Sequence, residues 1–214
     1  ILPEGDAFHA VGGENAMITA MLADGFTGNK GRGGFYMTGD DGIPLARPLS
    51  GDGEPLADWR PASNALPDSA IRAADAAATQ REPLLEIIDG NDDCARFSRR
   101  VLGRVLAYAA SLVPDVTTSP QDIDDAMKLG FNWQRGPFEM IDAIGTSRMA
   151  ALLDEAGLET PAVLASSDAF YRADGDVLTV RHSDGKFAAV SLPEGVLRFH
   201  MTRQTLTPLT STNA

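Results

Sequence analysis

Apolar residues recur at helical spacing over most of this chain, and this pattern predicts a mainly helical protein. The longest helix is expected from Asp92 or Asp93 to Val113, and Pro114 ends it. Its apolar face comprises Val101, Leu102, Val105, Leu106, Ala109, Leu112 and Val113. Shorter helices are expected over residues 14–24, 68–80, 82–89, 147–156 and 161–166.

Residues 119–145 predict two helices joined by a tight turn. Ser119 and Pro120 suit the cap and first position of a helix, and Gly130 suits the left-handed conformation that ends one. The expected apolar stripe of this helix is Ile123, Ala126, Met127 and Leu129. Gly136 and Pro137 then open a second helix, whose apolar positions are Phe138, Ile141 and Ile144. We expect Phe131 and Trp133 in the turn.

The periodicity changes near the C-terminus. Residues 176–181 and 186–192 predict two strands joined by a tight turn at Asp184 and Gly185, and residues 196–201 predict a further strand. Such a small sheet needs support from the helices or from another domain. Residues 37–68 contain many Gly, Pro, Asp and Ser residues and predict a connecting segment.

Composition narrows the classes of partner. The formal net charge of −12 repels nucleic acid and anionic membranes, so we expect neither. No apolar run approaches the roughly 20 residues of a membrane span, no signal peptide opens the chain, and Cys94 is the single cysteine. We therefore expect a cytoplasmic protein without an internal disulfide, with Cys94 as a small buried residue and no metal site. Because the chain begins at Ile1 without Met, we expect that it is cut from a longer polypeptide.

Residues 25–36 form a glycine-rich segment with two cations, which raises the possibility of a phosphate-binding loop. The spacing differs from a Walker loop, and no Ser or Thr follows Lys30. A dinucleotide fingerprint requires a preceding strand, whereas a helix is predicted before Gly25 and an extended segment at Phe35 and Tyr36. The segment therefore does not favour a nucleotide site.

Two sequences within residues 122–145, DIDDAMKLGFNW and GPFEMIDAIG, closely resemble the C-terminal helical domain of the 3-hydroxyacyl-CoA dehydrogenases. The fit is better still to the enzymes in which this dehydrogenase is fused to an enoyl-CoA hydratase. The resemblance implies a mainly α fold, a helical bundle like that C-terminal domain with a small C-terminal β-hairpin. The structural motif residues that carry it are Lys30, Gly34, Phe35, Tyr36, Gly130, Gly136, Pro137 and Phe138.

The same resemblance implies how the chain is divided, because fused members of the family carry two helical repeats. Residues 1–42 correspond to the tail of a truncated first repeat, and residues 43–90 to a linker with short helices. Residues 91–167 correspond to the second repeat. Residues 168–214 correspond to a β-hairpin extension that leads to a further domain.

In this family a Rossmann domain binds NAD and supplies a catalytic His–Glu pair. His9, His182 and His200 lie outside any such motif, so we expect no catalytic and no cofactor-binding residue in this chain. NAD then belongs to the parent enzyme, and the chain alone is inactive. The implied partners are the Rossmann and hydratase domains of the same polypeptide, the acyl-CoA substrate of the parent, and a second copy through the helical faces.

Four arginines crowd the first half of the long helix: Arg96, Arg99, Arg100 and Arg104. In so acidic a chain they are candidates for substrate binding through CoA phosphates, or for contact with acidic groups of a neighbouring domain. The alternative is a solvated helix face that makes surface ion pairs. In the family an Asn at the position of Arg99 faces the substrate, so this repeat is expected to be non-catalytic.

Two other functions remain open at this point. The chain could be a free-standing helical interaction module that uses its apolar faces. It could also be a small acyl-CoA-binding protein, for which the four arginines are the only support.

Overall fold

The computed structural model describes residues 3–10, 15–47, 58–63, 65–166, 168–175 and 177–192. The chain forms two compact units, residues 1–65 and residues 66–214, which are described separately. The predicted division into repeats stays a prediction. The contacts nevertheless place α2 (Asp68–Ala78) and α3 (Pro83–Ile88), expected in a linker, against α4 (Asp93–Ser111) of the second unit.

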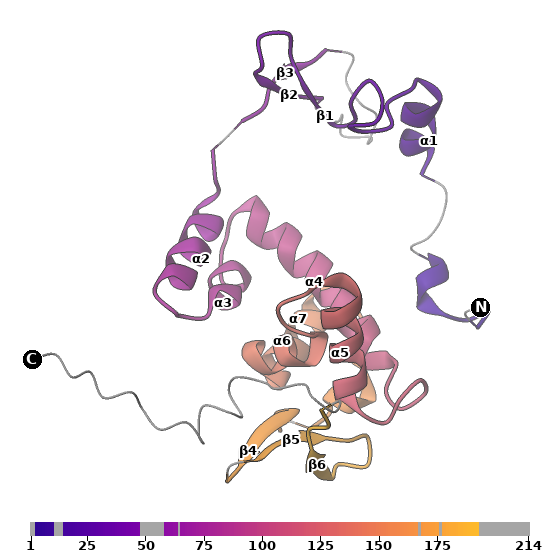
Figure 1. The fold of residues 1–214 in the computed structure, drawn as a ribbon. Coiled ribbons are helices and arrows are strands. Elements are labelled where there is room, and N and C mark those ends of the chain that lie inside the picture. The colour runs from indigo at the N-terminus through magenta and orange to yellow at the C-terminus, as the bar shows by residue number, and fades with distance from the viewer. Residues whose placement is uncertain are drawn as a thin grey trace, which may run out of the picture. The chain divides into compact units, whose positions relative to one another are not determined.

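The described residues of the first unit form one α-helix and a small antiparallel sheet (Figure 1). After a 3-10 turn, η1 (Ala7–Ala10), comes α1 (Ala16–Ala23), where Asn15 accepts the N–H groups of Met17 and Ile18. The sheet has the order β1–β2–β3, with bounds Tyr36–Thr38, Pro44–Ala46 and Arg60–Pro61. The prediction of a connecting segment over residues 37–68 was therefore wrong where β1, β2 and β3 form. Strands of two or three residues are too short to show alternation.

The second unit holds the other helices and a second three-stranded sheet. After α2, α3 and α4 follow α5 (Pro120–Phe131), α6 (Pro137–Ile144), α7 (Thr146–Glu155) and the 3-10 turn η2 (Ala162–Leu164). The antiparallel sheet then comprises β4 (Tyr171–Asp174), β5 (Val177–Arg181) and β6 (Phe187–Ala189). The prediction of a mainly helical fold is confirmed. No helix in the described ranges is long and apolar enough to cross a membrane.

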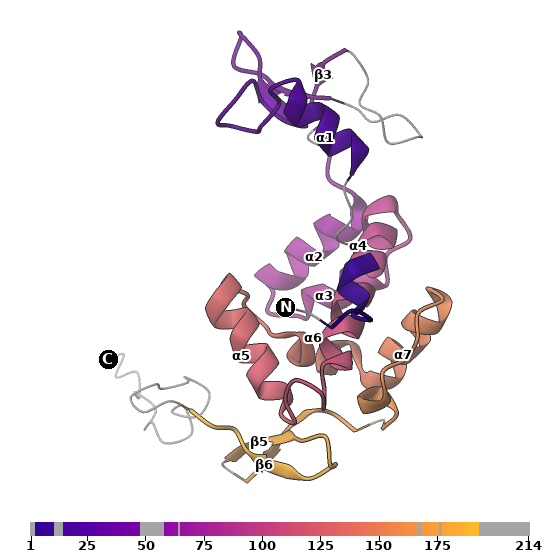
Figure 2. The same cartoon turned by 90° about the vertical axis from the view of Figure 1, so that its right-hand side faces the viewer.

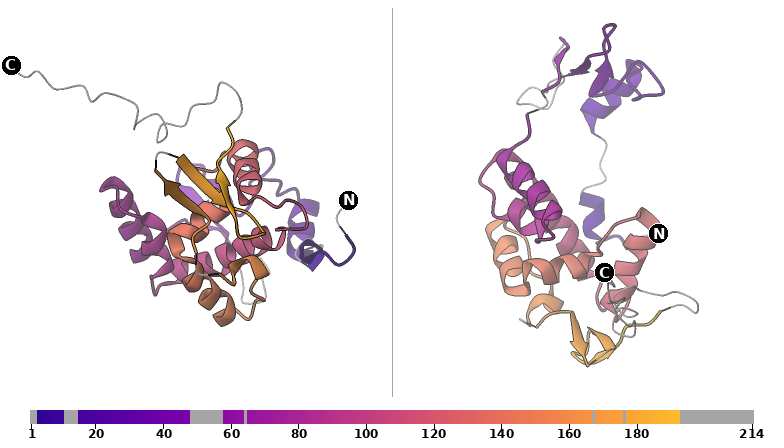
Figure 3. Two further views of the ribbon diagram at one scale, coloured as in Figure 1. Left: turned by 90° about the horizontal axis from the view of Figure 1, so that it is seen from below. Right: turned by 60° about the vertical axis from the view of Figure 1, so that its left-hand side comes forward.

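Helix α6 lies at the centre of the second unit. It contacts α3, α4, α5 and α7, and Figure 2 shows α5 at the edge of this helical body. Phe138 and Ile141 of α6 are fully buried with Leu106, Leu153 and Phe170. The β4–β5–β6 sheet lies at one end of the helical body, where β5 contacts α5 (Figure 3). The sheet is therefore supported by the helices, as its small size requires.

Helix α5 differs from its prediction in both its end and its buried face. It continues past Gly130 to Phe131, and Asn132 takes the left-handed conformation with φ 56°. Leu129 is 84% exposed, whereas Asp124 is fully buried. Ser119 occupies the cap position without a side-chain hydrogen bond. The expected apolar stripe was therefore wrong at Ala126 and Leu129, whereas Ile123 packs against the core as expected. The inward side also carries the polar group of Asp124.

Two further expectations are corrected in part. Most of the predicted apolar face of α4 is at least partly buried, but Val101 is 42% exposed and lies one turn from Phe97, which is 68% exposed. The predicted hairpin is confirmed for β5 and β6, with Gly185 at φ +81° in the turn, while β4 precedes it and was not predicted. The strand expected at 196–201 lies outside the described residues.

Candidate functional site

The four arginines of α4 do not form one cluster. Arg99 is partly buried, and its Nη1 donates to the carbonyl oxygens of Ile88 at 2.7 Å and Gly90 at 2.6 Å. These are free carbonyl groups at the end of α3, where a cation is favourable. Arg99 therefore joins α3 to α4, and this use is structural.

The other three arginines are exposed. Arg96 donates to the carbonyl oxygen of Asn91 at 2.7 Å and pairs with Asp93. Arg100 and Arg104 lie one turn apart on the face that also presents Phe97 and Val101, at the spacing i, i+3, i+4 and i+7. We call these four residues the α4 face. Of the predicted substrate-binding residues, only Arg100 and Arg104 lie together on an exposed apolar surface.

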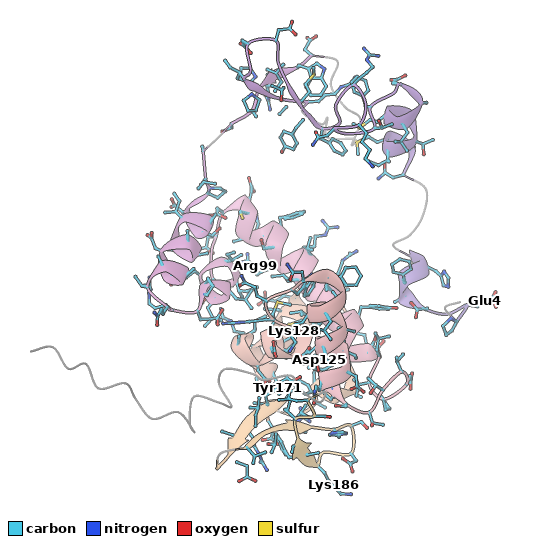
Figure 4. All side chains as sticks on the ribbon, in the orientation of Figure 1. Glu4, Arg99, Asp125, Lys128, Tyr171 and Lys186 are labelled. Atoms are coloured by element: carbon cyan, nitrogen blue, oxygen red, sulfur yellow. The ribbon has the colours of Figure 1, made fainter. Side chains whose placement is uncertain are left out.

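A shallow cleft of about 300 Å³ lies beside Arg99, which is labelled in Figure 4. Its lining contains two arginines, Arg99 and Arg148, and two carboxylates, Asp89 and Glu155. Arg148 is paired with Asp89. Opposite charges in equal number give this cleft no preference for an anion, so it does not support a CoA phosphate site at Arg99.

Helices α5 and α6 are joined by a buried carboxylate. Asp124 of α5 accepts the backbone N–H groups of Phe138 at 2.8 Å and Glu139 at 3.2 Å. These N–H groups lie in the first turn of α6 and have no partner within the helix. Gly136 precedes that turn and has no side chain to cap it, so Asp124 caps α6 from the neighbouring helix.

The motif residues Gly136 and Pro137 have matching backbone reasons. A Cβ atom at position 136 would lie 2.3 Å from Asp124, so only glycine permits this approach of the two helices. Pro137 occupies the first position of α6, where no backbone N–H is needed. Glu139 accepts the N–H of Gly136 at 2.9 Å. Gly136, Pro137 and Phe138 therefore act structurally.

A second layer of polar contacts surrounds Asp124. The Tyr171 hydroxyl at the start of β4 donates to Asp124 Oδ2 at 2.8 Å. Lys128 binds Glu139 at 2.6 Å and Asp125 at 3.3 Å. Figure 4 shows Lys128 and Asp125 beside α5, with Tyr171 below them toward the sheet. We call Asp124, Lys128, Glu139 and Tyr171 the Asp124 network. It joins α5, α6 and β4.

Burial dominates the electrostatics of this network. It raises the pKa of Asp124 to about 7, although the hydrogen bonds from Phe138 N–H and the Tyr171 hydroxyl act in the opposite direction. Burial and the nearby Asp124 carboxylate raise the pKa of Tyr171. A carboxyl group whose pKa lies near neutral pH has the pKa that suits a general base. However, Asp124 is fully buried and bound by three protein donors. It lines neither the cleft beside Arg99 nor the cleft beside the Gly28–Gly33 turn.

A second carboxylate on α6 fixes the sheet. Asp142 accepts the backbone N–H of Phe170 at 2.7 Å and of Tyr171 at 2.8 Å. The Phe170 ring packs edge-on against Phe138 at 4.7 Å between centroids. The Arg181 guanidinium lies 4.5 Å from the centre of the Phe170 ring. The start of β4 is thus docked on α6 by hydrogen bonds and aromatic packing.

Sequence reasoning missed Asp124, Asp142 and Tyr171. Asp124 stands one residue from Ile123 in a predicted apolar stripe, and Gly136-Pro137 signals a close helix approach. Together these features could have indicated a buried acid facing the next helix. Asp142 and Tyr171 gave no such signal, because their hydrogen-bond partners lie about thirty or more residues away in the sequence.

The motif residues of the first unit lie at a turn and at the start of β1. Gly33 has φ +108° and pairs with Gly28, and Lys30 is exposed in the turn between them. Gly34 and Phe35 are partly buried, and Tyr36 is 67% exposed. A cleft of about 370 Å³ beside this turn is lined mainly by apolar side chains. The expectation that this segment is not a nucleotide loop stays a prediction.

The remaining candidate residues do not add chemistry. His9 contacts the carbonyl oxygen of Pro3, His182 lies next to the β5–β6 turn, and His200 is outside the described residues. Cys94 is a free thiol and is half-buried instead of buried. Within the described ranges, no group of three or more His, Cys, Asp or Glu side chains could hold a metal ion.

The family model and the relatives that match this chain carry related descriptions. Residues 97–175 match the family model described as "3-hydroxyacyl-CoA dehydrogenase, C-terminal domain". A probable 3-hydroxyacyl-CoA dehydrogenase of Bacillus subtilis is 30% identical over 147 residues, which is 68% of this chain and 18% of that protein. Putative fatty acid oxidation complex trifunctional enzymes of Rickettsia felis and Rickettsia prowazekii are 28% and 26% identical over 141 residues, 65% of this chain and 18% of each relative.

No solved structure gives a significant match. The matched part of the chain spans less than a fifth of the length of these relatives. The family match covers most of α4, all of α5, α6 and α7, and β4, and so includes the Asp124 network and its docked strand. Residues 97–175 therefore match the 3-hydroxyacyl-CoA dehydrogenase C-terminal domain family.

Proposed function

We propose that the chain is the helical portion of an NAD-dependent 3-hydroxyacyl-CoA dehydrogenase of fatty-acid β-oxidation. The parent enzyme converts 3-hydroxyacyl-CoA to 3-ketoacyl-CoA in the cytoplasm, and its polypeptide also carries an enoyl-CoA hydratase. The observation that carries this proposal is the family match over the α4–β4 region, and the names of the relatives support it.

The chain contributes a rigid wall to the enzyme and no reacting group. The Asp124 network and Asp142 fix α5, α6 and β4 to one another through five hydrogen bonds from donors with defined geometry. Rigidity of this kind matters for hydride transfer, since a displacement of about 1 Å can cost on the order of a hundredfold in rate. The chain alone binds no NAD and is inactive.

The α4 face is the part of this wall that contacts the rest of the enzyme. Phe97 and Val101 supply exposed apolar area, and Arg100 and Arg104 supply two guanidinium groups on the same side. Aromatic and arginine side chains are the types that dominate binding energy in protein interfaces. An acidic and apolar surface of an adjoining domain, or of a second copy, is the partner that fits this chemistry.

A calorimetric titration of the 214-residue chain tests which of the parent enzyme's ligands this chain binds by itself. Acetoacetyl-CoA and NADH are titrated separately into the chain. We expect no heat from NADH, and at most weak binding of acetoacetyl-CoA that is lost in an Arg100→Glu, Arg104→Glu variant. Saturable binding of NADH would contradict the proposal. Tight CoA-ester binding that survives the double substitution would favour a substrate site elsewhere in the chain.

A further inference from the structure

A side chain of α5 holds the end of the second sheet. Ser191 follows β6 by two residues, and both of its backbone groups are paired with Gln121. The Ser191 N–H donates to Gln121 Oε1 at 2.9 Å, and the Ser191 carbonyl oxygen accepts from Gln121 Nε2. In an antiparallel ladder, a residue exchanges the same two hydrogen bonds with a neighbouring strand. The Gln121 amide therefore takes the place of a neighbouring strand at Ser191.

The orientation of the Gln121 amide is fixed by all of its partners. Gln121 is only 6% exposed, and its Nε2 also donates to Asp125 Oδ2 at 3.0 Å. A backbone N–H can only donate, so the amide oxygen must face the Ser191 N–H. A carbonyl oxygen and a carboxylate oxygen can only accept, so the amide nitrogen must face the other two partners. Rotation of the amide would break all of these hydrogen bonds at a buried position.

Lys128 holds the carboxylate that orients Gln121. It lies one turn after Asp125 on α5, and its Nζ is 3.3 Å from Asp125 Oδ1 and 2.6 Å from Glu139 Oε1. The Lys128 side chain is 17% exposed, and those of Asp125 and Glu139 are 23% and 28% exposed. Ion pairs with so little access to water are screened less than pairs on an open surface. Lys128 therefore keeps Asp125 in place beside Gln121.

Glu139 extends these contacts to the turn between α5 and α6. Its Oε1 binds Lys128, and its Oε2 accepts the N–H of Gly136 at 2.9 Å. Asp125 is used in the same way, with one oxygen on Lys128 and the other on Gln121. The contacts thus form one continuous path from Gly136 to Ser191. We call its four side chains the Lys128 relay: Glu139, Lys128, Asp125 and Gln121.

Asp124 and Asp142 hold the other end of the sheet. They accept the Tyr171 hydroxyl and the backbone N–H groups of Phe170 and Tyr171, at the start of β4. The sheet is therefore fastened to α5 and α6 at both ends. The fastening at Ser191 differs from the one at β4, because it runs through the ion pairs of Lys128.

We propose that the Lys128 relay couples the α5–α6 turn to the end of the sheet. Lys128 and Gln121 are then positioning residues, and loss of the charge of Lys128 releases Ser191 through Asp125 and Gln121. This inference goes beyond the proposed function and does not depend on it, because it concerns contacts within the second unit.

The physical reason for the coupling lies in the charges. Without the Lys128 ammonium group, the Asp125 and Glu139 carboxylates repel each other and are better placed toward water. Gln121 then loses the acceptor of one N–H group at a buried position, where an unpaired donor is costly. The Gln121 amide regains a partner by moving, and that movement breaks its two hydrogen bonds to Ser191.

Amide hydrogen exchange of the 214-residue chain, followed by NMR at constant pH, tests the coupling. Lys128→Met should speed exchange at Ser191 by about tenfold or more, whereas Lys128→Arg, which keeps the charge, should change it by less than about threefold. Exchange at Val190, whose N–H is bonded within the sheet, should change by less than about threefold in both variants. Lys186→Met removes an exposed, ion-paired lysine and is the matched control, with no change expected at Ser191. Unchanged exchange at Ser191 in Lys128→Met would overturn the proposal.

A double substitution distinguishes coupling from two separate effects. Gln121→Met removes the hydrogen bonds of Gln121 with a side chain of similar size, and should speed exchange at Ser191 by about tenfold or more. Adding Lys128→Met should then have less than about a threefold further effect, since the path is already broken. Effects that multiply in the double variant would contradict the coupling.

Asp125→Ala covers the case in which Lys128→Met does not fold. It shortens a partly exposed side chain of α5 to a good helix former, and it removes the acceptor between Lys128 and Gln121. Exchange at Ser191 should again rise about tenfold or more, while exchange at Val190 stays within about threefold. Unchanged exchange at Ser191, or equal acceleration at both amides, would show that Ser191 is not held through the relay, and the proposal would then be wrong.

Discussion

The Asp124 network and the α4 face use charged residues in opposite ways. Asp124 is fully buried, and each of its contacts is to a group of the same domain. Arg100 and Arg104 are exposed beside Phe97, which is 68% exposed. From this contrast we infer that the longest sequence motif of the chain, which contains Asp124, specifies its fold. The surface for which we propose binding to other molecules, the α4 face, lies outside that motif.

The largest expected effect on the fold comes from Phe138→Ala. Phe138 is fully buried and packs on Phe170, so its truncation leaves a cavity and removes the support of β4. We expect the free energy of unfolding of the second unit to fall by about 4 kcal/mol. Chemical denaturation monitored by helical circular dichroism measures the change. An unfolding midpoint equal to that of the unaltered chain would show that Phe138 is not central to the core.

Two glycine substitutions test whether α5 and α6 approach each other closely at Gly136. Gly136→Ala places a methyl group 2.3 Å from Asp124 and should destabilise the domain by about 3 kcal/mol. Gly130→Ala meets no atom within 4 Å inside α5, and should stabilise it by about 0.5 to 1 kcal/mol. Equal effects of the two substitutions, measured by thermal unfolding, would rule out the close approach of α5 and α6.

The pH dependence of stability tests the buried carboxylate. Because the pKa of Asp124 is raised to about 7 in the folded state, the folded chain binds more protons than the unfolded chain between about pH 4 and pH 7. The free energy of unfolding should therefore fall as pH rises through this window, by on the order of a few kcal/mol. Asp92 acts at lower pH with the opposite sign, since hydrogen bonds from Ser69 and Ala95 lower its pKa to about 2.

Asp124→Asn isolates this contribution. The variant should show a flatter slope between pH 4 and pH 7, with a residual slope from Asp142, whose pKa is also raised by burial. Urea unfolding at several pH values provides the measurement. A slope that is the same in the variant and in the unaltered chain would mean that Asp124 keeps an ordinary pKa.

The smallest expected change in stability lies on the α4 face. Arg100→Glu with Arg104→Glu should alter the free energy of unfolding of the chain by about 0.5 kcal/mol or less. In the proposed parent enzyme the same substitutions should lower dehydrogenase kcat/KM at least tenfold, because we propose that this face contacts another part of that enzyme. Lys186→Glu, on the exposed β5–β6 turn, is the matched control. Equal activity of the two variants would exclude the α4 face as a contact.

Sequence patterns predicted the helices well because local signals set them. Asp92 caps α4 and Pro137 opens α6 as expected. The end of α5 was misplaced because Asn132, which also tolerates the left-handed conformation, follows Gly130 by two residues. The local preference at this position favours Gly over Asn, so the local rule alone gave the wrong end.

The contacts of the candidate site were harder to predict from the sequence than the helices were. Arg99 was predicted to bind substrate, yet its partners are the carbonyl oxygens of Ile88, at the end of α3, and of Gly90, just after it. Backbone partners of this kind cannot be recognised from side-chain types in the sequence. The Tyr171 hydroxyl meets Asp124 across 47 positions of sequence. Contacts between residues so far apart in the sequence depend on how the helices pack. The strands of the first sheet were missed for another reason, because they are too short to show a period of two.

The most direct test of the proposed role is NADH oxidation with acetoacetyl-CoA, measured for the complete gene product and for residues 1–214 alone. We predict turnover by the complete product, no turnover by residues 1–214, and at least tenfold lower turnover when Gly136→Ala disturbs the Asp124 network. Turnover by residues 1–214 alone, or a complete product without this activity, would contradict the account.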